Sequence, residues 1–147
     1  AVNALWDAAP LVGDRVAIVG AGMVGCAIAG VLGHFPGVDV TLVDVDPSRA
    51  QTAERLGVSF ALPTDASGER DLTFHTSAHS AGLQLSLDLL ATEGTVVDLS
   101  WYGDTEVALS LGAAFHSRRL RNSAAWIAST SRWEGRASWS RSARARP

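Results

Sequence analysis

The chain has 147 residues, 47% of them hydrophobic, and a formal net charge of −3, which predicts one domain around one core. No apolar run reaches the ~18 residues of a membrane span, and no charged-then-apolar leader is present, so we expect neither a membrane span nor a signal peptide. The single cysteine, Cys26, excludes an intrachain disulfide and is predicted to be a buried hydrophobe in a cytoplasmic protein.

Predicted helices and strands alternate along the first 120 residues. A helical pattern opens the chain and stops at Pro10, and we interpret residues 1–12 as the end of a connecting helix. Strands are predicted over residues 15–19, 38–43, 58–61, 71–75 and 95–99. Helices are predicted over residues 22–32, 46–56 and 80–94. This alternation predicts an α/β fold over residues 13–120, a doubly wound parallel sheet in three αβα layers, which is the NAD(P)-binding Rossmann fold.

The most informative motif is VAIVGAGMVG, residues 16–25, where a strand leads through glycines into a helix. Gly20 predicts a tight turn, Gly22 lets the backbone approach a diphosphate, and Gly25 lets the helix pack closely on the strand. The free N–H groups at the helix start favour that diphosphate. Asp44 follows Gly25 by 19 residues, where its carboxylate can accept both hydroxyls of the adenosine ribose. Because Asp44 would repel a 2′-phosphate, we predict NAD, with NADP less favoured.

With these motifs, residues 14 to 120 resemble the cofactor domain of the medium-chain dehydrogenase/reductase family, which includes the zinc-type alcohol dehydrogenases. The segments that carry the resemblance are GDRVAIVGAGMVG, VTLVDVDPSRAQTAERLGV and LSLDLLATEGTVVDLSWYG. The resemblance implies that Asp44 and Arg49 contact the adenosine ribose. For Arg49, a merely solvated side chain is the alternative. The resemblance also implies hydride transfer between a nicotinamide cofactor and an alcohol or carbonyl compound.

The same resemblance implies a substrate domain that this chain does not contain, so we expect a fragment that is inactive alone. Zinc is expected only in that missing domain, because one cysteine and four scattered histidines do not make a three-ligand site. We therefore predict no metal ligand and no catalytic residue in the chain.

Further candidate cofactor contacts follow the ends of predicted strands. His75 and Thr76 leave the fourth strand and Ser100 leaves the fifth, on the edge where the nicotinamide half would lie. For Ser100, as for its neighbour Trp101, an ordinary loop role is an equal alternative. Met23 and Val24, inside the glycine motif, complete the predicted cofactor-binding set.

Residues 121–147 are predicted to be an irregular tail rich in Arg, Ser and Trp. Residues 118–147 hold eight arginines against the single acid Glu134, whereas residues 1–117 hold fourteen acids against four arginines. Neither a helical nor a strand period is sustained, so the segment can hardly bury a face. A truncated or out-of-frame terminus is one interpretation. A basic tail that binds nucleic acid is a second and less favoured one.

Two classes of function remain open at this stage. The first is the NAD-binding half of an oxidoreductase, and the second is a non-catalytic NAD-binding module or sensor. A short-chain dehydrogenase is disfavoured because its Tyr and Lys pair cannot form in a chain without lysine, and a methyltransferase is a minor alternative. We expect a dinucleotide and a small alcohol or carbonyl substrate as partners, no membrane and no nucleic acid, with a homo-oligomer as an open alternative.

Overall fold

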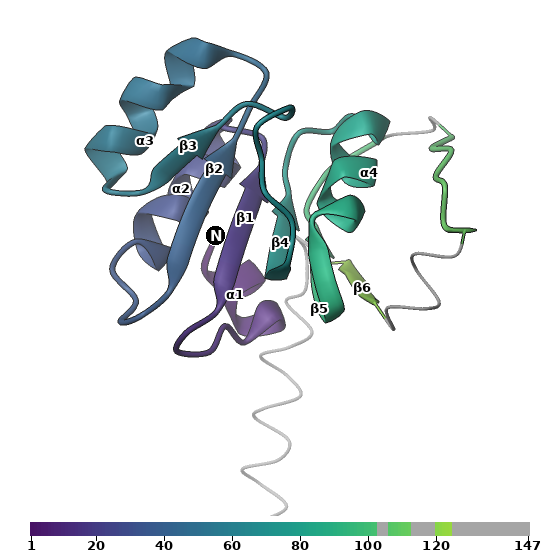
Figure 1. Ribbon diagram of the computed structural model, residues 1–147, viewed down its shortest axis with the longest axis horizontal. Helices are drawn as coiled ribbons and strands as arrows, with labels where there is room; N and C mark the ends of the chain where they lie inside the picture. The colour runs from purple at the N-terminus through teal and green to yellow at the C-terminus, as the bar shows by residue number, and fades with distance from the viewer. Residues whose placement is uncertain (103–105, 113–119, 125–147) are drawn as a thin grey trace, which may run out of the picture.

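The computed structural model describes residues 1–102, 106–112 and 120–124, which form one parallel sheet with helices on both faces (Figure 1). The sheet order is β3-β2-β1-β4-β5-β6. The strands are β1 (Arg15–Val19), β2 (Asp39–Val43), β3 (Ser59–Ala61), β4 (Arg70–His75), β5 (Leu90–Asp98) and β6 (Arg121–Ala124). The helices are α1 (Val2–Ala8), α2 (Met23–Leu32), α3 (Ala50–Leu56) and α4 (Ser80–Asp88), with a 3₁₀ turn, η1 (Pro47–Arg49), before α3. The predicted α/β Rossmann fold is confirmed.

Alternation along β1 divides the core between the two faces of the sheet. Val16 and Ile18 are buried in the larger cluster, which includes side chains of α1 and α2. Ala17 and Val19 point to the opposite face, where they cluster with Leu89 beside α4. Because both faces of a parallel sheet are covered, its strands are continuously apolar, as the sequence of β1 is.

The region from α4 to β5 differs from the prediction of a helix ending at Gly94 and a strand over residues 95–99. The helix ends at Asp88, and β5 already pairs with β4 at Leu90. The register then shifts between Arg70 and Leu72, so the start of β5 bulges. Gly94 lies inside this bulge, where a Cβ would come 2.9 Å from Leu90 Cδ2. Leu90 fits the helical spacing of Leu83 and Leu87, and this spacing predicted a longer helix. In the structure Leu90 is instead a buried residue of strand β5.

Residues 121–124 also differ from the prediction of an irregular tail. They form β6, a parallel edge strand in which Arg121 pairs with Thr95 and Ala124 with Asp98. An edge strand is held by main-chain hydrogen bonds to one neighbour and needs no apolar period to form. The rest of the predicted tail, residues 125–147, lies outside the described residues.

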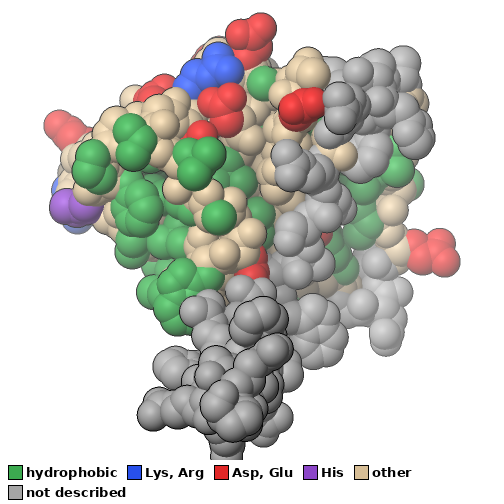
Figure 2. All heavy atoms as spheres, turned by 90° about the horizontal axis from the view of Figure 1, so that it is seen from below, with side chains coloured by type: hydrophobic (Ala, Val, Ile, Leu, Met, Phe, Trp, Pro, Cys, Tyr) green, Lys and Arg blue, Asp and Glu red, His purple; other side chains and the backbone are tan. Residues whose placement is uncertain are grey.

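The end of the molecule seen from below carries many hydrophobic side chains (Figure 2). Exposed large apolar side chains from α1 and the loops at this end are Val2, Trp6, Leu11, Val12 and Phe35. Within the described part of the chain, no helix combines the length and apolarity needed to cross a bilayer. The carboxyl ends of the strands, where Rossmann folds bind ligands, lie at the opposite end.

Candidate functional site

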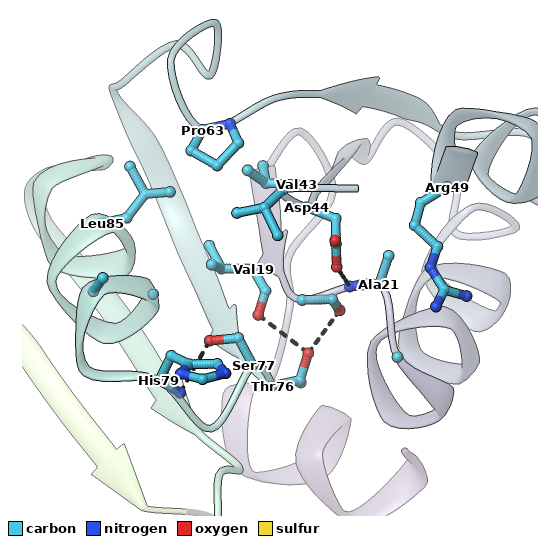
Figure 3. A pocket seen from close by; sticks show the side chains of 15 residues that line it. Val19, Ala21, Val43, Asp44, Arg49, Pro63, Thr76, Ser77, His79 and Leu85 are labelled. Atoms are coloured by element: carbon cyan, nitrogen blue, oxygen red, sulfur yellow. Dashed lines mark hydrogen bonds between the residues drawn. The ribbon is translucent and has the colours of Figure 1, made fainter. Parts of the chain in front are cut away.

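A cleft of about 690 Å³ opens at the carboxyl ends of β1, β2 and β4 (Figure 3). Its lining comes from the β1–α2 turn, the end of β2, η1, the loop after β3, the β4–α4 loop and the first turns of α4. The position is the crevice in which open α/β sheets bind ligands, because chain connections on the two sides of β1 diverge there.

The glycine turn forms the floor of this cleft. Gly20 has φ +113°, and a Cβ there would lie 2.8 Å from the backbone N of Ser77, so both conformation and space require glycine. Gly22 caps α2, and a Cβ there would meet nothing within 4 Å, so its main chain faces open space. A Cβ at Gly25 would collide with the Gly20 carbonyl oxygen, which confirms the close helix-to-strand packing predicted for Gly25.

Thr76 braces the glycine turn from β4. Its hydroxyl lies 2.8 Å from the carbonyl oxygen of Gly20 and 3.2 Å from that of Val19, and it donates between them. The Thr76 N–H also donates to Val19 O at 2.9 Å. Thr76 lines the cleft as predicted for a site residue, but its hydroxyl proton is used to hold the turn.

Asp44 braces the same turn from β2. Its Oδ2 accepts a 2.6 Å hydrogen bond from the Ala21 N–H, and its Oδ1 accepts one of 2.9 Å from the Asp46 N–H. The carboxylate is half-buried and lines the cleft (Figure 3). Each oxygen retains a lone pair after these bonds, so the group can still accept ligand hydroxyls.

Arg49 also lines the cleft, at its solvent side. Its Nε lies 3.4 Å from Asp46 Oδ2, an exposed ion pair of small energetic weight. Asp46 caps η1 by accepting from the Ser48 N–H at 2.9 Å. The pKa of Asp46 lies below its usual value, mainly because Ser48 donates hydrogen bonds to the carboxylate and, to a smaller extent, because Arg49 is positively charged. Arg49 is therefore placed near Asp44 without being tied to it.

Three predicted residues do not line the cleft because they face elsewhere. Met23 is 88% exposed at the start of α2, whereas Val24 and Gly25 pack toward the core and the glycine turn. Five of the ten predicted cofactor contacts do line it, namely Gly20, Gly22, Asp44, Arg49 and Thr76.

His75 and Ser100, the other two predicted contacts, lie behind the cleft wall. The His75 ring is fully buried, with Nδ1 2.9 Å from Asp98 Oδ1 and Nε2 2.7 Å from Ser77 Oγ. Ser100 Oγ accepts from the Ala78 N–H at 3.0 Å and lies 3.1 Å from His75 Nδ1. The structure therefore does not give either side chain direct access to a ligand in the cleft.

The pKa values in this polar cluster reflect burial and hydrogen bonding. Burial raises the pKa of Asp98, but hydrogen bonds from His75 and the Ser100 N–H outweigh burial, and the pKa lies below its usual value. Burial and then the charge of Asp98 raise the pKa of Tyr102 to about 12. The Tyr102 ring stacks on His75 with centroids 6.1 Å apart. Asp98 is thus ionised and Tyr102 neutral around the histidine at neutral pH.

Several lining residues were not predicted from the sequence. They come from the loop after β3, the β4–α4 loop and the first turns of α4, and they are Pro63, Ser77, His79, Ala81, Gly82 and Leu85. Their only sequence signal is position, since they follow predicted strands at the same edge of the sheet. Over the described ranges, no group of three His, Cys, Asp or Glu side chains is arranged to hold a metal ion.

Comparisons with known proteins place this geometry among dehydrogenases and reductases. Residues 16–99 match the family model described as ketopantoate reductase PanE/ApbA. An L-threonine 3-dehydrogenase of Streptomyces avermitilis is 38% identical over 81 residues, which are 52% of this chain and 23% of that protein. The chain thus spans about a quarter of the length of this curated relative.

Solved structures share the fold at low sequence identity. L-idonate 5-dehydrogenase of Escherichia coli has a TM-score of 0.75 at 19% identity, covering 85% of this chain and 38% of that one. An Escherichia coli alcohol dehydrogenase complexed with NADH has a TM-score of 0.76 at 16% identity, covering 88% and 41%. Others with this fold were solved with NAD or NADP. At these identities the likeness shows the fold.

Proposed function

This chain belongs to the ketopantoate reductase PanE/ApbA family, and from that premise we propose that it is the NAD-binding part of an oxidoreductase. The proposed reaction is hydride transfer involving an alcohol or carbonyl carbon of a small substrate. When bound, the nicotinamide cofactor would supply the hydride chemistry, and the residues of this chain hold and orient it. The finer proposal, kinship with the medium-chain zinc-type dehydrogenases, is supported by the names of the threonine dehydrogenase and of the alcohol dehydrogenases that share the fold.

The observation that carries the proposal is the contact between Asp44 and the glycine turn. The 2.6 Å hydrogen bond from the Ala21 N–H to Asp44 Oδ2 brings the acid directly beside the turn. An acceptor for ribose hydroxyls and a main-chain cradle for a diphosphate are thus neighbours on one cleft wall. That pairing is what a dinucleotide requires.

The remaining walls of the cleft fit the other parts of such a ligand. The open space at Gly22 lies at the N-terminus of the ten-residue helix α2, where main-chain N–H groups favour an anionic diphosphate. Pro63 and Leu85 form an apolar wall on the far side of the cleft (Figure 3). We propose that this wall takes the flat face of the adenine.

Charge supports NAD over NADP. Asp44 and Asp46 place two carboxylates in the β2–α3 connection, and Arg49 supplies one guanidinium that is already paired with Asp46. The net negative charge would repel a 2′-phosphate. A phosphate on the 2′-oxygen would also remove the hydroxyl from which Asp44 accepts a hydrogen bond. We propose NAD as the cofactor, with discrimination residing in Asp44.

Titration calorimetry of the purified chain with NAD and NADP tests this site. Each charge-assisted hydrogen bond contributes about 1.5–3 kcal/mol. Asp44→Gly is therefore expected to lower the affinity for NAD by roughly 10–100-fold and to narrow the preference for NAD over NADP. Gly22→Val is expected to abolish NAD binding, because the valine side chain would fill the space proposed for the diphosphate. The fold is expected to persist, because a Cβ at this position meets no protein atom within 4 Å. Glu54→Gln, which removes an exposed charge from α3, is the matched control and is expected to bind like wild type. Unchanged NAD affinity in both site variants would remove the assignment.

Turnover is a separate question from binding. The chain spans 23% of the length of the curated relative, so the activity of a whole enzyme is proposed here and does not follow from the shared fold. We expect the purified chain to bind NAD without oxidising a panel of alcohols. Turnover by this chain would exclude the alternative of a binding-only module or sensor.

A further inference from the structure

Ser77, His75 and Asp98 form a continuous chain of hydrogen bonds that nucleotide binding does not use. Ser77 Oγ lies 2.7 Å from His75 Nε2, and His75 Nδ1 lies 2.9 Å from Asp98 Oδ1. The register of β4 and β5 pairs His75 with Asp98, and Ser77 follows two residues after the end of β4. The imidazole is fully buried, whereas Ser77 lines the cleft. Only the serine end of the chain therefore reaches a ligand.

The direction of these hydrogen bonds follows from Asp98. An ionised carboxylate can only accept, so the proton between Asp98 and His75 resides on Nδ1. The Nε2 of the neutral ring then carries a lone pair, and the Ser77 hydroxyl donates to it. The Ser100 N–H donates to the same Asp98 Oδ1 at 3.0 Å, which fixes the carboxylate in place. This is the polarity that a general base needs to take a proton from a serine.

Gly82 leaves space around the reactive atoms. A Cβ at Gly82 would run into Ser77 Oγ and would lie 3.0 Å from His75 Nε2. The His79 N–H reaches Ser77 Oγ at 3.4 Å from the start of α4. By helix geometry, the N–H groups of Ser80 and Ala81 have no partner within α4, and Ala81 also lines the cleft. Main-chain donors are thus available beside the serine for charge that develops on a carbonyl oxygen.

We propose that Ser77 is an activated nucleophile with His75 as its general base and Asp98 as a positioning residue, and that the cleft supports acyl transfer from small activated esters. Ser77 Oγ attacks the ester carbonyl carbon and forms an Oγ–C bond while its proton moves to His75 Nε2. The ester C–O bond then breaks, and the departing alkoxide takes a proton from a water molecule in the cleft, which leaves a hydroxide ion there. The hydroxide adds to the acyl carbon, the Oγ–C bond breaks, and His75 Nε2 returns its proton to Ser77 Oγ as the acid leaves.

Labelling with phenylmethylsulfonyl fluoride tests the nucleophile in the purified 147-residue chain. In that reaction the Oγ–S bond forms, the S–F bond breaks, fluoride leaves, and the proton moves to His75. Intact-mass measurement and peptide mapping are expected to find one adduct, on Ser77. Ser77→Ala is expected to slow labelling by at least about 100-fold. Ser59→Ala, which removes an exposed hydroxyl from β3, outside the cleft lining, is expected to stay within about twofold of wild type. The absence of an adduct, or an adduct on another residue, overturns the proposal.

The role of Asp98 requires a readout besides reactivity. The ring ¹⁵N shifts of His75 are expected to report a proton on Nδ1 in wild type and a switched tautomer in Asp98→Asn, whose backbone ¹⁵N spectrum also reports the fold. Labelling of Ser77 is expected to slow by about 10²–10⁴-fold in that variant. An unchanged rate with a switched tautomer contradicts the positioning role. Where a substitution at this half-buried site prevents folding, the wild-type adduct and Ser77→Ala still decide the proposal.

Discussion

Replacing Gly20 with alanine is expected to destabilise the chain more than the same change at Gly57, although both glycines have positive φ. The left-handed conformation costs an L-residue about 1–2 kcal/mol at either position, with φ +113° at Gly20 and +72° at Gly57. The surroundings differ. A Cβ at Gly57 meets nothing within 4 Å, whereas one at Gly20 lies 2.8–2.9 Å from backbone atoms of Thr76 and Ser77.

Backbone atoms cannot turn away as a flexible side chain can, so the contact at Gly20 adds an overpacking cost of about 1–3 kcal/mol. We expect Gly20→Ala to lower the free energy of unfolding by roughly 2–5 kcal/mol and Gly57→Ala by roughly 1–2 kcal/mol. Equilibrium denaturation in urea with linear extrapolation measures both losses. Equal losses in the two variants would refute the close approach of the glycine turn to the segment after β4.

Two other predictions concern the hydrogen bonds around the cleft. Thr76→Val removes the donor to Gly20 O and is expected to lower the free energy of unfolding by about 1 kcal/mol and the NAD affinity by up to about fivefold. Thr76→Ser keeps the hydroxyl and is expected to match wild type in both measurements. A serine variant as weak as the valine variant would contradict the bracing role of this hydroxyl. Tyr102, the single tyrosine of the chain, is expected to form phenolate with a midpoint near pH 12 in the folded state and near 10 in denaturant, followed by near-ultraviolet absorbance. Because its folded pKa is raised, its contribution to stability is present below pH 10 and is lost as the pH rises toward 12; a folded midpoint near 10 would show that the ring is not buried against Asp98.

The parts of the fold that the sequence predicts are those in which local signals agree. Four strands, β1 to β4, were predicted within a residue or two because their apolar runs are bounded by glycine, proline or polar turns. β5 was predicted to begin five residues too late, since the helical spacing of Leu83, Leu87 and Leu90 hides the change from helix to strand. β6 was not predicted at all, because pairing along a sheet edge depends on the neighbouring strand and not on its own side chains.

The site follows the same division between local and long-range information. The glycine turn and Asp44 belong to one spaced motif and were found from it. His75 was expected in the cleft because it ends a strand, but side chains alternate along a strand. It shares a face with Thr73, whose hydroxyl donates to Ser86 O in α4 at 3.1 Å. That alternation turns His75 beneath α4 toward Asp98, and Ser77 takes the position at the cleft.

The glycine turn is held from both neighbouring strands before any ligand arrives. Asp44 in the connection after β2 accepts from the Ala21 N–H, and Thr76 after β4 donates to the Gly20 carbonyl. A turn fixed in this way loses little conformational freedom when a diphosphate binds, so less of the interaction energy is consumed in ordering it. The bracing groups therefore affect stability and affinity together, whereas Gly22, whose main chain faces open space, affects affinity alone. A variant of Gly22 that loses NAD affinity but keeps its stability would therefore distinguish a binding site from a turn with a structural role only.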